Sequence, residues 1–402
     1  MISKVSDAQA IAPLGVILLG GVYGSLAVAR SLGRRGVPVC YFSTHRTVVS
    51  ASRYVAHYVE WSGPDADNAL RTLLDHSAAR GLKNWLLLPS SDIDVQFVSR
   101  NHAVLAEHFT LLTMPWSALE QLNDKAQLYA LAGRLGIDCP EVYWNGTTRQ
   151  SEADEICLPV VIKPASTERI NPLTRAKAWK AETQLDYETR FAKATSFQGN
   201  GGFVVQQLIP GDGRVQFSYA GLWNQGREVC SMTARRARQF PAEFGTSPFV
   251  EAVELPRVTD AARALLEAVG YHGLVEVEFK LDSRDNQLKL LDVNTRIWAW
   301  IGLGGAADRD FPLLAFQLAF GHTPVVTKPP GYGAHWVHSA PNTLSLLQSL
   351  RRTGRLGFAG WAWLRPGGVH AVAATDDPLP GLAEIPILIG RGVSGVLRRA
   401  LP

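Results

Sequence analysis

The 402-residue chain is poor in cysteine, and it has no long hydrophobic run. Its four cysteines are Cys40, Cys139, Cys157 and Cys230. They form no C-x-x-C pair, which argues against the common zinc, thiol-redox and iron–sulfur motifs. No segment reaches the roughly 18 apolar residues of a membrane helix, and we find no lipidation signal or internal repeat. We therefore expect a protein of the reducing cytoplasm with no membrane partner.

Neither sign of charge is in large excess, because the chain has 40 basic and 36 acidic residues and a net charge of +4. The basic residues are dispersed and no aromatic-basic motif accompanies them, so we expect no nucleic-acid partner. Hydrophobic residues make up 46% of the chain, which is typical of globular proteins. The length predicts two or three domains with a sizeable core.

Strands and helices alternate in the first part of the chain. Apolar runs indicate buried strands at 15–21, 37–42 and 84–90, and apolar spacing indicates helices at 25–36, 67–81 and 117–136. Strands that alternate with helices predict βαβ units and a parallel sheet. The chain then changes character near residue 113, where we place a domain boundary.

The remainder of the chain indicates antiparallel pairing. The segment 165–200 is polar and is interpreted as a mobile loop and small lid. Strands are predicted at 158–164 and 201–213, and a pair of strands within 215–232 is joined by a turn at 224–226. A helix at 259–269 and a hairpin at 274–296 follow. The predicted fold class is therefore α/β, with a parallel-sheet domain at 1–113, a second domain at 114–330 whose lid spans about 155–213, and an appended subdomain at 331–402.

The hairpin carries the clearest chemical pattern. Glu276 and Glu278 alternate with apolar residues, and Asp292 and Asn294 do the same on the partner strand. Alternation places these side chains on one face. Glu278, Asp292 and Asn294 would then form an oxygen cluster of the kind that holds Mg²⁺ against phosphates. An ordinary solvent-facing strand pair is the alternative.

Two lysines and two glutamines extend this pattern. Lys125 opens a helix after Asn-Asp, and Lys163 ends a buried strand, where it needs an anionic partner such as a phosphate or a structural carboxylate. Gln206 and Gln207 end another strand, where an amide and an edge backbone could contact an adenine ring.

In their order and spacing, the segments 123–137, 160–164, 204–212, 274–280 and 290–296 resemble the ATP-grasp superfamily of carboxylate-amine ligases. The resemblance covers about residues 10–325. It implies a pre-ATP-grasp domain at the N-terminus, a lid, and a larger antiparallel ATP-grasp subdomain. It also implies that ATP and Mg²⁺ are required, with two metal ions expected and Mn²⁺ as a substitute.

The resemblance assigns roles to matched positions. By this likeness Lys125 and Lys163 contact nucleotide phosphates, and Gln206, Gln207 and Leu208 form the adenine hinge. Asp212, just after the hinge, is also expected to bind ATP. Glu278, Asp292 and Asn294 match the Mg²⁺ ligands, and Arg296 matches an arginine that stabilises the acyl phosphate or substrate carboxylate. A basic segment beside the transferred phosphoryl group makes Arg235 and Arg238 catalytic candidates. The family often has glutamate at the position of Asp292. The segment after Lys163 lacks the usual glycine-rich flap, for which Ser166, Thr167, Arg169 or Lys177 would substitute.

Weaker signals point to the substrate. Gly21 and Tyr23 belong to a glycine-containing strand-to-helix turn that could face an anion, although the spacing is not that of a dinucleotide fingerprint. Ser91 and Asp92 end a predicted strand where α/β sheets bind ligands, or simply cap a helix. Trp298 lines an acceptor pocket or fills the core.

These features together predict an ATP-dependent ligase that forms an amide or peptide bond through an acyl phosphate and releases ADP and phosphate. Its expected partners are a small-molecule carboxylate and an amine, and a homodimer is one option for its assembly. A non-catalytic ATP-binding regulatory protein of the same fold is the alternative, and an NAD(P)-dependent oxidoreductase is disfavoured by the poor fingerprint.

Overall fold

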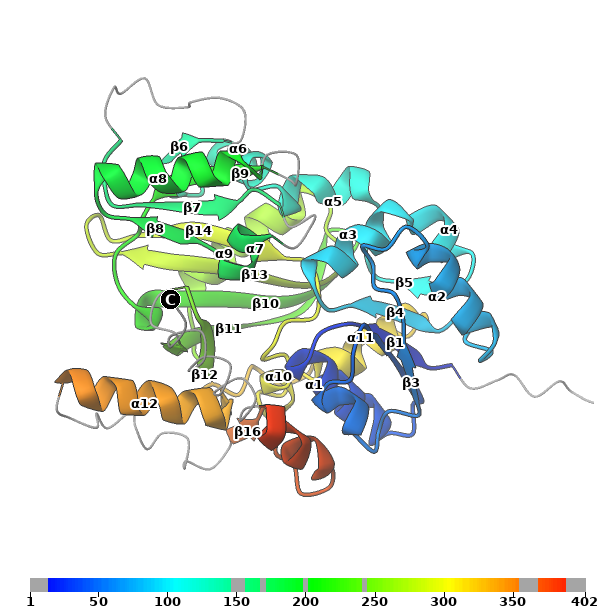
Figure 1. Cartoon of the computed structure of the whole chain (residues 1–402). Helices are drawn as coiled ribbons and strands as arrows, with labels where there is room; N and C mark the ends of the chain where they lie inside the picture. Colours follow the sequence, from blue (N-terminus) through cyan, green and yellow to red (C-terminus); the bar gives the residue numbers. More distant parts are fainter. Residues whose placement is uncertain are drawn as a thin grey trace, which may run out of the picture.

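The computed structural model describes residues 14–145, 156–166, 171–197, 202–240, 244–353 and 368–387. Their strands form three sheets of five, four and seven strands (Figure 1). The predicted α/β class, with a parallel-sheet unit and a larger antiparallel unit, is confirmed. None of the helices in these ranges combines the length and apolar character needed to cross a membrane.

The five-stranded sheet has the order β3-β2-β1-β4-β5, and all of its pairs are parallel. Its strands are β1 (Val16–Leu19), β2 (Val39–Ser43), β3 (His57–Glu60), β4 (Leu86–Pro89) and β5 (Thr110–Leu111). Its helical elements are α1 (Tyr23–Gly33), η1 (Val48–Ala51), α2 (Ala69–Ala78), α3 (Asp92–Arg100) and α4 (His102–Ala106).

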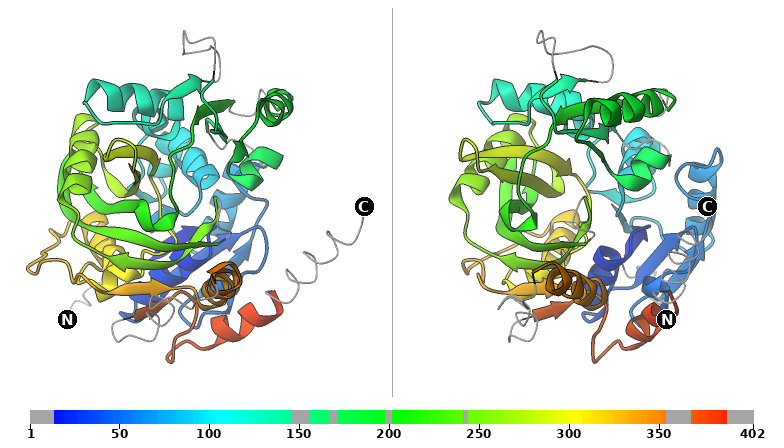
Figure 2. Two further views of the ribbon diagram at one scale, coloured as in Figure 1. Left: turned by 90° about the vertical axis from the view of Figure 1, so that its left-hand side faces the viewer. Right: turned by 60° about the vertical axis from the view of Figure 1, so that its left-hand side comes forward.

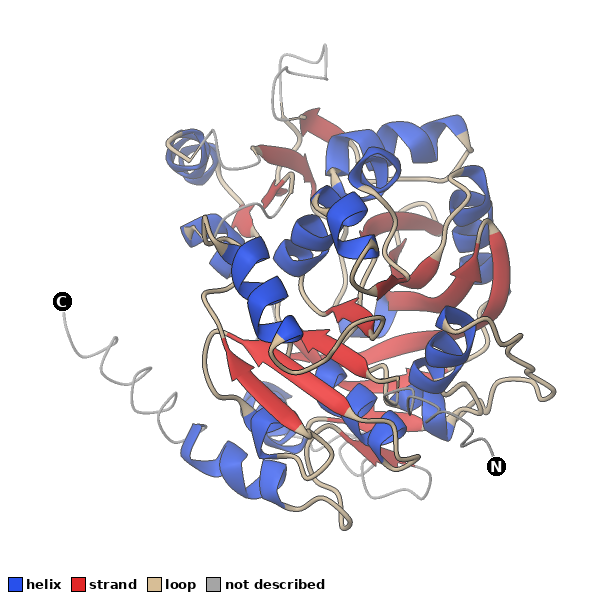
Figure 3. Ribbon diagram, turned by 90° about the vertical axis from the view of Figure 1, so that its right-hand side faces the viewer, coloured by secondary structure: helices blue, strands red, loops and turns tan. Residues whose placement is uncertain are grey.

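Helices cover both faces of this sheet (Figure 3). Val16 and Leu18 of β1 belong to a core shared with α1, whereas Ile17 and Leu19 belong to a second core shared with α2 and α3. Both faces of β1 are therefore buried, which explains why its residues form a continuous apolar run.

The predicted single helix at 117–136 is wrong. The structure has two helices, α5 (Trp116–Asn123) and α6 (Lys125–Arg134), separated by Asp124 in an extended conformation. The Asp124 carboxylate accepts a hydrogen bond from the Gln127 backbone N–H at 2.9 Å and caps α6. A short side chain that bonds the backbone in this way competes with helix continuation.

The four-stranded sheet is antiparallel, with the order β6-β9-β7-β8. It contains β6 (Val142–Trp144), β7 (Val160–Pro164), β8 (Trp179–Ala181) and β9 (Phe203–Gln207), together with α7 (Pro172–Ala176) and α8 (Gln184–Thr195). The described part of 165–200 is thus more ordered than the loop that its polarity indicates. Helix α8 fully buries only Ala194 on the sheet, so its composition stays polar.

The seven-stranded sheet has the order β14-β13-β10-β11-β12-β15-β16. Its strands are β10 (Gln216–Asn224), β11 (Arg227–Phe240), β12 (Thr246–Ala252), β13 (Gly273–Asp282), β14 (Gln287–Asn294), β15 (His335–Val337) and β16 (Gly368–His370). The remaining elements are η2 (Gly213–Val215), α9 (Pro256–Ala268), α10 (Leu303–Ala306), α11 (Phe311–Ala319) and α12 (Ser339–Thr353). The predicted hairpin and strand pair are confirmed.

The C-terminal part of the chain continues this sheet, because β15 pairs with β12 and β16 pairs with β15. The chain then returns to the N-terminal domain, where residues 379–387 are helical (Figure 2). Asp377, just before this helix, forms a buried 2.9 Å ion pair with Arg30 of α1. The C-terminal segment therefore bridges the seven-stranded sheet and the N-terminal domain.

Candidate functional site

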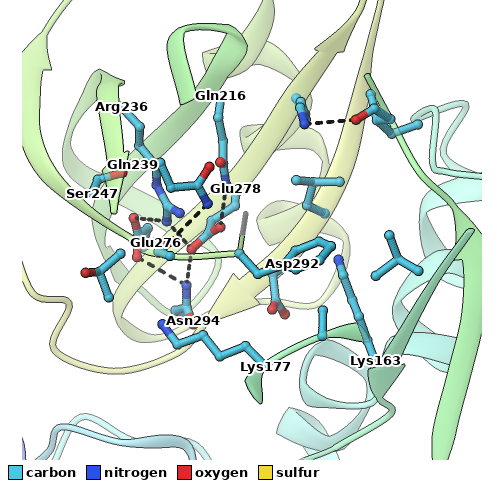
Figure 4. Close-up of a pocket in the computed structure, with 18 of the residues that line it drawn as sticks. Lys163, Lys177, Gln216, Arg236, Gln239, Ser247, Glu276, Glu278, Asp292 and Asn294 are labelled. Carbon is cyan, nitrogen blue, oxygen red and sulfur yellow. Dashed lines mark hydrogen bonds and ion pairs between the residues drawn. The ribbon is translucent and has the colours of Figure 1, made fainter. Parts of the chain in front are cut away.

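A cavity of about 760 Å³ is lined by residues of both antiparallel sheets and of the N-terminal domain. The four-stranded sheet contributes Lys163 and Gln206, and the seven-stranded sheet contributes the acidic face of the β13–β14 hairpin. Figure 4 shows the carboxylates of this hairpin directed toward the same space as Lys163 and Lys177. Residues from distant parts of the chain thus meet in one place.

The acidic face follows directly from strand register. Glu276 lies opposite Asn294 and Glu278 lies opposite Asp292, with a bulge immediately after Glu278. The Asn294 side-chain amide donates to Glu276 at 3.1 Å and to Glu278 at 3.0 Å. The predicted placement of Glu278, Asp292 and Asn294 on one face is therefore confirmed.

Arg236 of β11 supplies the positive charge for the two glutamates. Its guanidinium forms ion pairs with Glu276, at 3.4 Å, and with Glu278. Burial opposes ionisation of Glu278, but Arg236, Lys177 and the Asn294 hydrogen bond together outweigh it and hold the pKa of Glu278 below its ordinary value. Burial, and then the neighbouring Glu278 charge, raise the pKa of Glu276. The negative charge of this pair is therefore concentrated on Glu278.

Glu276 is occupied by structural contacts. It accepts hydrogen bonds from Ser218 Oγ and from Trp300 Nε1, each at 2.9 Å, and it is only 3% exposed. With Arg236 and Asn294 added, Oε1 has three donors and Oε2 has one. We therefore regard Glu276 as an anchor of the acidic face, whereas Glu278 and Asp292 are its more available oxygen donors.

Two lysines face the acidic residues. Lys125 Nζ contacts Asp292 Oδ1 at 3.2 Å. Burial opposes the lysine charge, but Asp292, Asp92 and Glu278 together outweigh burial and raise the pKa of Lys125. Burial, and then the nearby Lys125 charge, lower the pKa of Lys163 to about 8. An anion bound here would restore the charge of Lys163.

The chain segment proposed as an adenine hinge also borders the cavity, through Gln206, Gln207 and Leu208. The backbone N–H groups of Gln207 and Leu208 donate to the carbonyls of Glu141 and Pro159 at 2.8 and 3.1 Å. The Gln206 amide oxygen accepts from the Tyr129 hydroxyl at 2.9 Å. This segment is consequently held firmly at the cavity edge.

Arg296 connects the acidic face to the N-terminal domain. Its Nε atom donates to Asp92 at 2.5 Å, and its Nη2 atom donates to the Asn294 oxygen at 2.8 Å. Burial opposes the charge, but the carboxylates of Asp92, Glu276 and Asp292 together outweigh burial and raise the pKa of Arg296. Arg296, Asp92 and Tyr23 all line the cavity. The N-terminal domain therefore contributes to the site, as expected for Asp92 and Tyr23.

Several residues singled out from the sequence lie outside the cavity lining: Gly21, Ser91, Asp212, Arg235, Arg238 and Trp298. Arg235 pairs with Glu251 at 2.8 Å, and Arg238 donates to Asn342 and lies over the Phe249 ring. Asp212 pairs with Arg214.

Ser91 and Trp298 have structural contacts. Ser91 accepts a hydrogen bond from the Asp94 N–H and caps α3, and Trp298 is 1% exposed within the main core. Of the residues after Lys163, Thr167 and Arg169 fall outside the described residues, whereas Lys177 lines the cavity.

Sequence reasoning missed Arg236 because alternation alone does not say which of two adjacent arginines faces inward, and a bulge between Arg236 and Arg238 changes the alternation again. It also left out Glu276, although the E-x-E spacing places it on the correct face. His338 gave no sequence signal at all.

The donor set fits a hard cation. In the described part of the chain, no three His, Cys, Asp or Glu side chains form a metal-binding group by themselves. Mg²⁺ characteristically binds through one or two carboxylates together with phosphate oxygens. Glu278 and Asp292 supply two such carboxylates, and the lysines supply the cations that phosphates need.

No protein-family model matches the chain. Among curated proteins, it is 24% identical over 298 residues to "D-aspartate ligase" of Enterococcus faecium (strain Aus0004), which covers 70% of each chain. A shorter match, 28% identical over 150 residues, links 36% of this chain to 27% of "Biotin carboxylase, chloroplastic" of Arabidopsis thaliana.

Solved structures show the same architecture. A biotin carboxylase from Campylobacter jejuni has a TM-score of 0.62 at 14% identity, covering 80% of this chain and 74% of its own. An L-amino acid ligase from Bacillus licheniformis has a TM-score of 0.59 at 15% identity, covering 77% and 74%. N5-carboxyaminoimidazole ribonucleotide synthetase from Thermus thermophilus has a TM-score of 0.57 at 16% identity, covering 80% and 81%. The chain therefore has the ATP-grasp fold.

Proposed function

We propose that this protein is an ATP-dependent carboxylate-amine ligase that forms an amide or peptide bond through an acyl phosphate. One observation carries the proposal: Lys125, Lys163 and Arg296 share a single cavity with the carboxylates of Glu278 and Asp292. This combination suits phosphoryl transfer, in which catalysis consists mainly of positioning and of charge stabilisation.

In the proposed reaction, a substrate carboxylate attacks the γ-phosphorus of ATP, and an amine then displaces phosphate from the acyl carbon. Lys125 and Lys163 hold the phosphates, the segment 206–208 binds adenine, and Arg296 stabilises the charge that develops on the acyl oxygen. Glu278, Asp292 and Asn294 would hold Mg²⁺, which neutralises phosphate charge when bound. Two metal ions, and replacement of Mg²⁺ by Mn²⁺, belong to the same proposal.

The relatives suggest which acids to test. The curated relative and one solved structure are named as D-aspartate and L-amino acid ligases, so amino acids are the first substrates to test on this chain. We accordingly propose small-molecule carboxylate and amine substrates. The domain limits at 113 and 330, and a homodimer, stay predictions.

The test is ADP release from MgATP with a pool of amino acids and other carboxylic acids. Hydroxylamine in the mixture converts an acyl phosphate into a hydroxamate, which mass spectrometry identifies together with its acid. Formation of a hydroxamate supports the proposal. ADP release without a hydroxamate contradicts the acyl phosphate, and ATP binding without turnover on any acid supports a non-catalytic ATP-binding protein.

A further inference from the structure

The C-terminal segment brings two interacting side chains to the cavity. His338 directly follows β15, which lies between β12 and β16 in the seven-stranded sheet, and its side chain lines the cavity. Glu384 belongs to the helical residues 379–387, which lie against the N-terminal domain (Figure 1). Neither residue has a part in the nucleotide site described above.

The two side chains form a nearly buried pair. His338 Nε2 lies 2.6 Å from Glu384 Oε1, and the side chains are 10% and 13% exposed. The Tyr23 hydroxyl donates to the same carboxylate oxygen at 3.4 Å, and the rings of Tyr23 and His338 are 4.2 Å apart. Because ionised Glu384 only accepts hydrogen bonds, Nε2 carries the proton and Nδ1 of a neutral imidazole keeps its lone pair.

Glu384 is fixed in place by the contacts of Asp377. This carboxylate is 1% exposed and accepts hydrogen bonds from Arg30 Nε at 2.9 Å, from Ser52 Oγ at 2.7 Å and from the Arg53 N–H at 2.9 Å. Such a buried network permits one arrangement of the segment. The segment therefore positions Glu384, and Glu384 orients His338.

The carboxylates that could act as bases beside the phosphate site are already engaged by cations. Glu276 and Glu278 pair with Arg236, Asp292 pairs with Lys125, and Asp92 pairs with Arg296. A carboxylate held by a cation is a weak proton acceptor, because protonation would break the ion pair. The partner of His338 is instead the carboxylate of Glu384, so no ion pair with a cation has to break when the ring accepts a proton.

We propose that His338 is the general base that deprotonates the amine substrate, and that Glu384 is its positioning residue. This inference rests on the proposed ligase function. An ammonium nucleophile gives one proton to His338 Nδ1, and its freed lone pair forms the C–N bond. The C–O bond to phosphate then breaks, and the second proton leaves with phosphate as hydrogen phosphate.

The experiment compares two nucleophiles. Hydroxylamine is already unprotonated at neutral pH and needs no base, whereas an aliphatic amine is protonated there. With the acid found by hydroxamate trapping and an amine pool of ammonia, methylamine and the common amino acids, we expect His338→Asn to lower amide formation about 100-fold or more. Hydroxamate formation should stay within about threefold of the original enzyme.

The pH profile separates a base from a merely structural residue. Amide formation by His338→Asn should rise with pH toward the wild-type rate as the amine loses its proton in solution, and Glu384→Gln should show a smaller loss of the same kind. His370→Asn is the matched control, because this histidine lies on β16 of the same segment and outside the cavity lining. Its rates should not change.

Any of four results would overturn the inference. His338→Asn could form amide as fast as the original enzyme, lose amide and hydroxamate formation equally, or fail to regain amide formation at high pH. The original enzyme could also form hydroxamate but no amide with any amine in the pool. A failure of the ligase function itself is distinguishable, since the original enzyme would then form no hydroxamate.

Discussion

The affinity for MgATP should weaken as pH rises through the titration of Lys163. Burial and the Lys125 charge lower the pKa of Lys163 to about 8 in the free protein, and bound phosphate favours the charged lysine. Below this pKa, Lys163 is already charged when the nucleotide binds. Above it, the lysine must take up a proton on binding, so the affinity falls as pH rises. The uptake of one proton should accompany binding at alkaline pH.

The magnitude follows from the same pKa. With a midpoint near 8, roughly nine-tenths of the lysine is charged at about pH 7 and roughly one-tenth at about pH 9, so the dissociation constant should rise about tenfold, or about 1.4 kcal/mol. Isothermal titration with MgATP in buffers of different ionisation enthalpy measures both the affinity and the proton count.

Two variants isolate Lys163 from other alkaline effects. Lys163→Arg keeps its charge over the whole range and should lose most of the slope, whatever its absolute affinity. Lys180→Arg, at the same cavity but already paired with Glu182, should keep the wild-type slope. An affinity that is constant between about pH 7 and pH 9 in the original enzyme, or a slope that survives in Lys163→Arg, would refute the reasoning.

Three further predictions concern acidic residues. Asp292→Asn should lower ADP release by about 100-fold or more with an unchanged melting temperature, whereas Asp285→Asn in the turn of the same hairpin should retain activity; normal turnover in Asp292→Asn would contradict the metal-ligand role. Asp377→Asn should cost about 3–5 kcal/mol in urea unfolding, because the buried Arg30 loses its charge partner, and no change would contradict the anchoring role. Burial raises the pKa of Asp94 to about 7, so the folded protein loses stability as pH rises from about 4 through 7 and this buried carboxyl ionises. Asp94→Asn, which cannot ionise, should therefore raise the melting temperature at about pH 8. Equal melting curves there would contradict a destabilising charge at Asp94.

The acidic face could be predicted from sequence because a strand has a period of two. Once Glu278 and Asp292 were placed on paired strands, the pleat left one arrangement in which both faced the cavity. Parallel pairing in the N-terminal domain was equally determined by local pattern, since continuous apolar strands alternated with helices. The order of lysines, glutamines and acidic residues was specific enough to indicate the ATP-grasp fold.

Tertiary structure alone decided which arginine faces the glutamates. Arg235 and Arg236 are adjacent and identical, and only the position of β11 between β10 and β12 directs Arg236 toward Glu278 and Arg235 toward Glu251. The pairing of His338 with Glu384 lay equally beyond sequence reasoning, because 46 residues separate them and neither belongs to a periodic pattern. Local physics determines which face of an element a side chain occupies, whereas contacts between distant elements depend on how the whole chain packs.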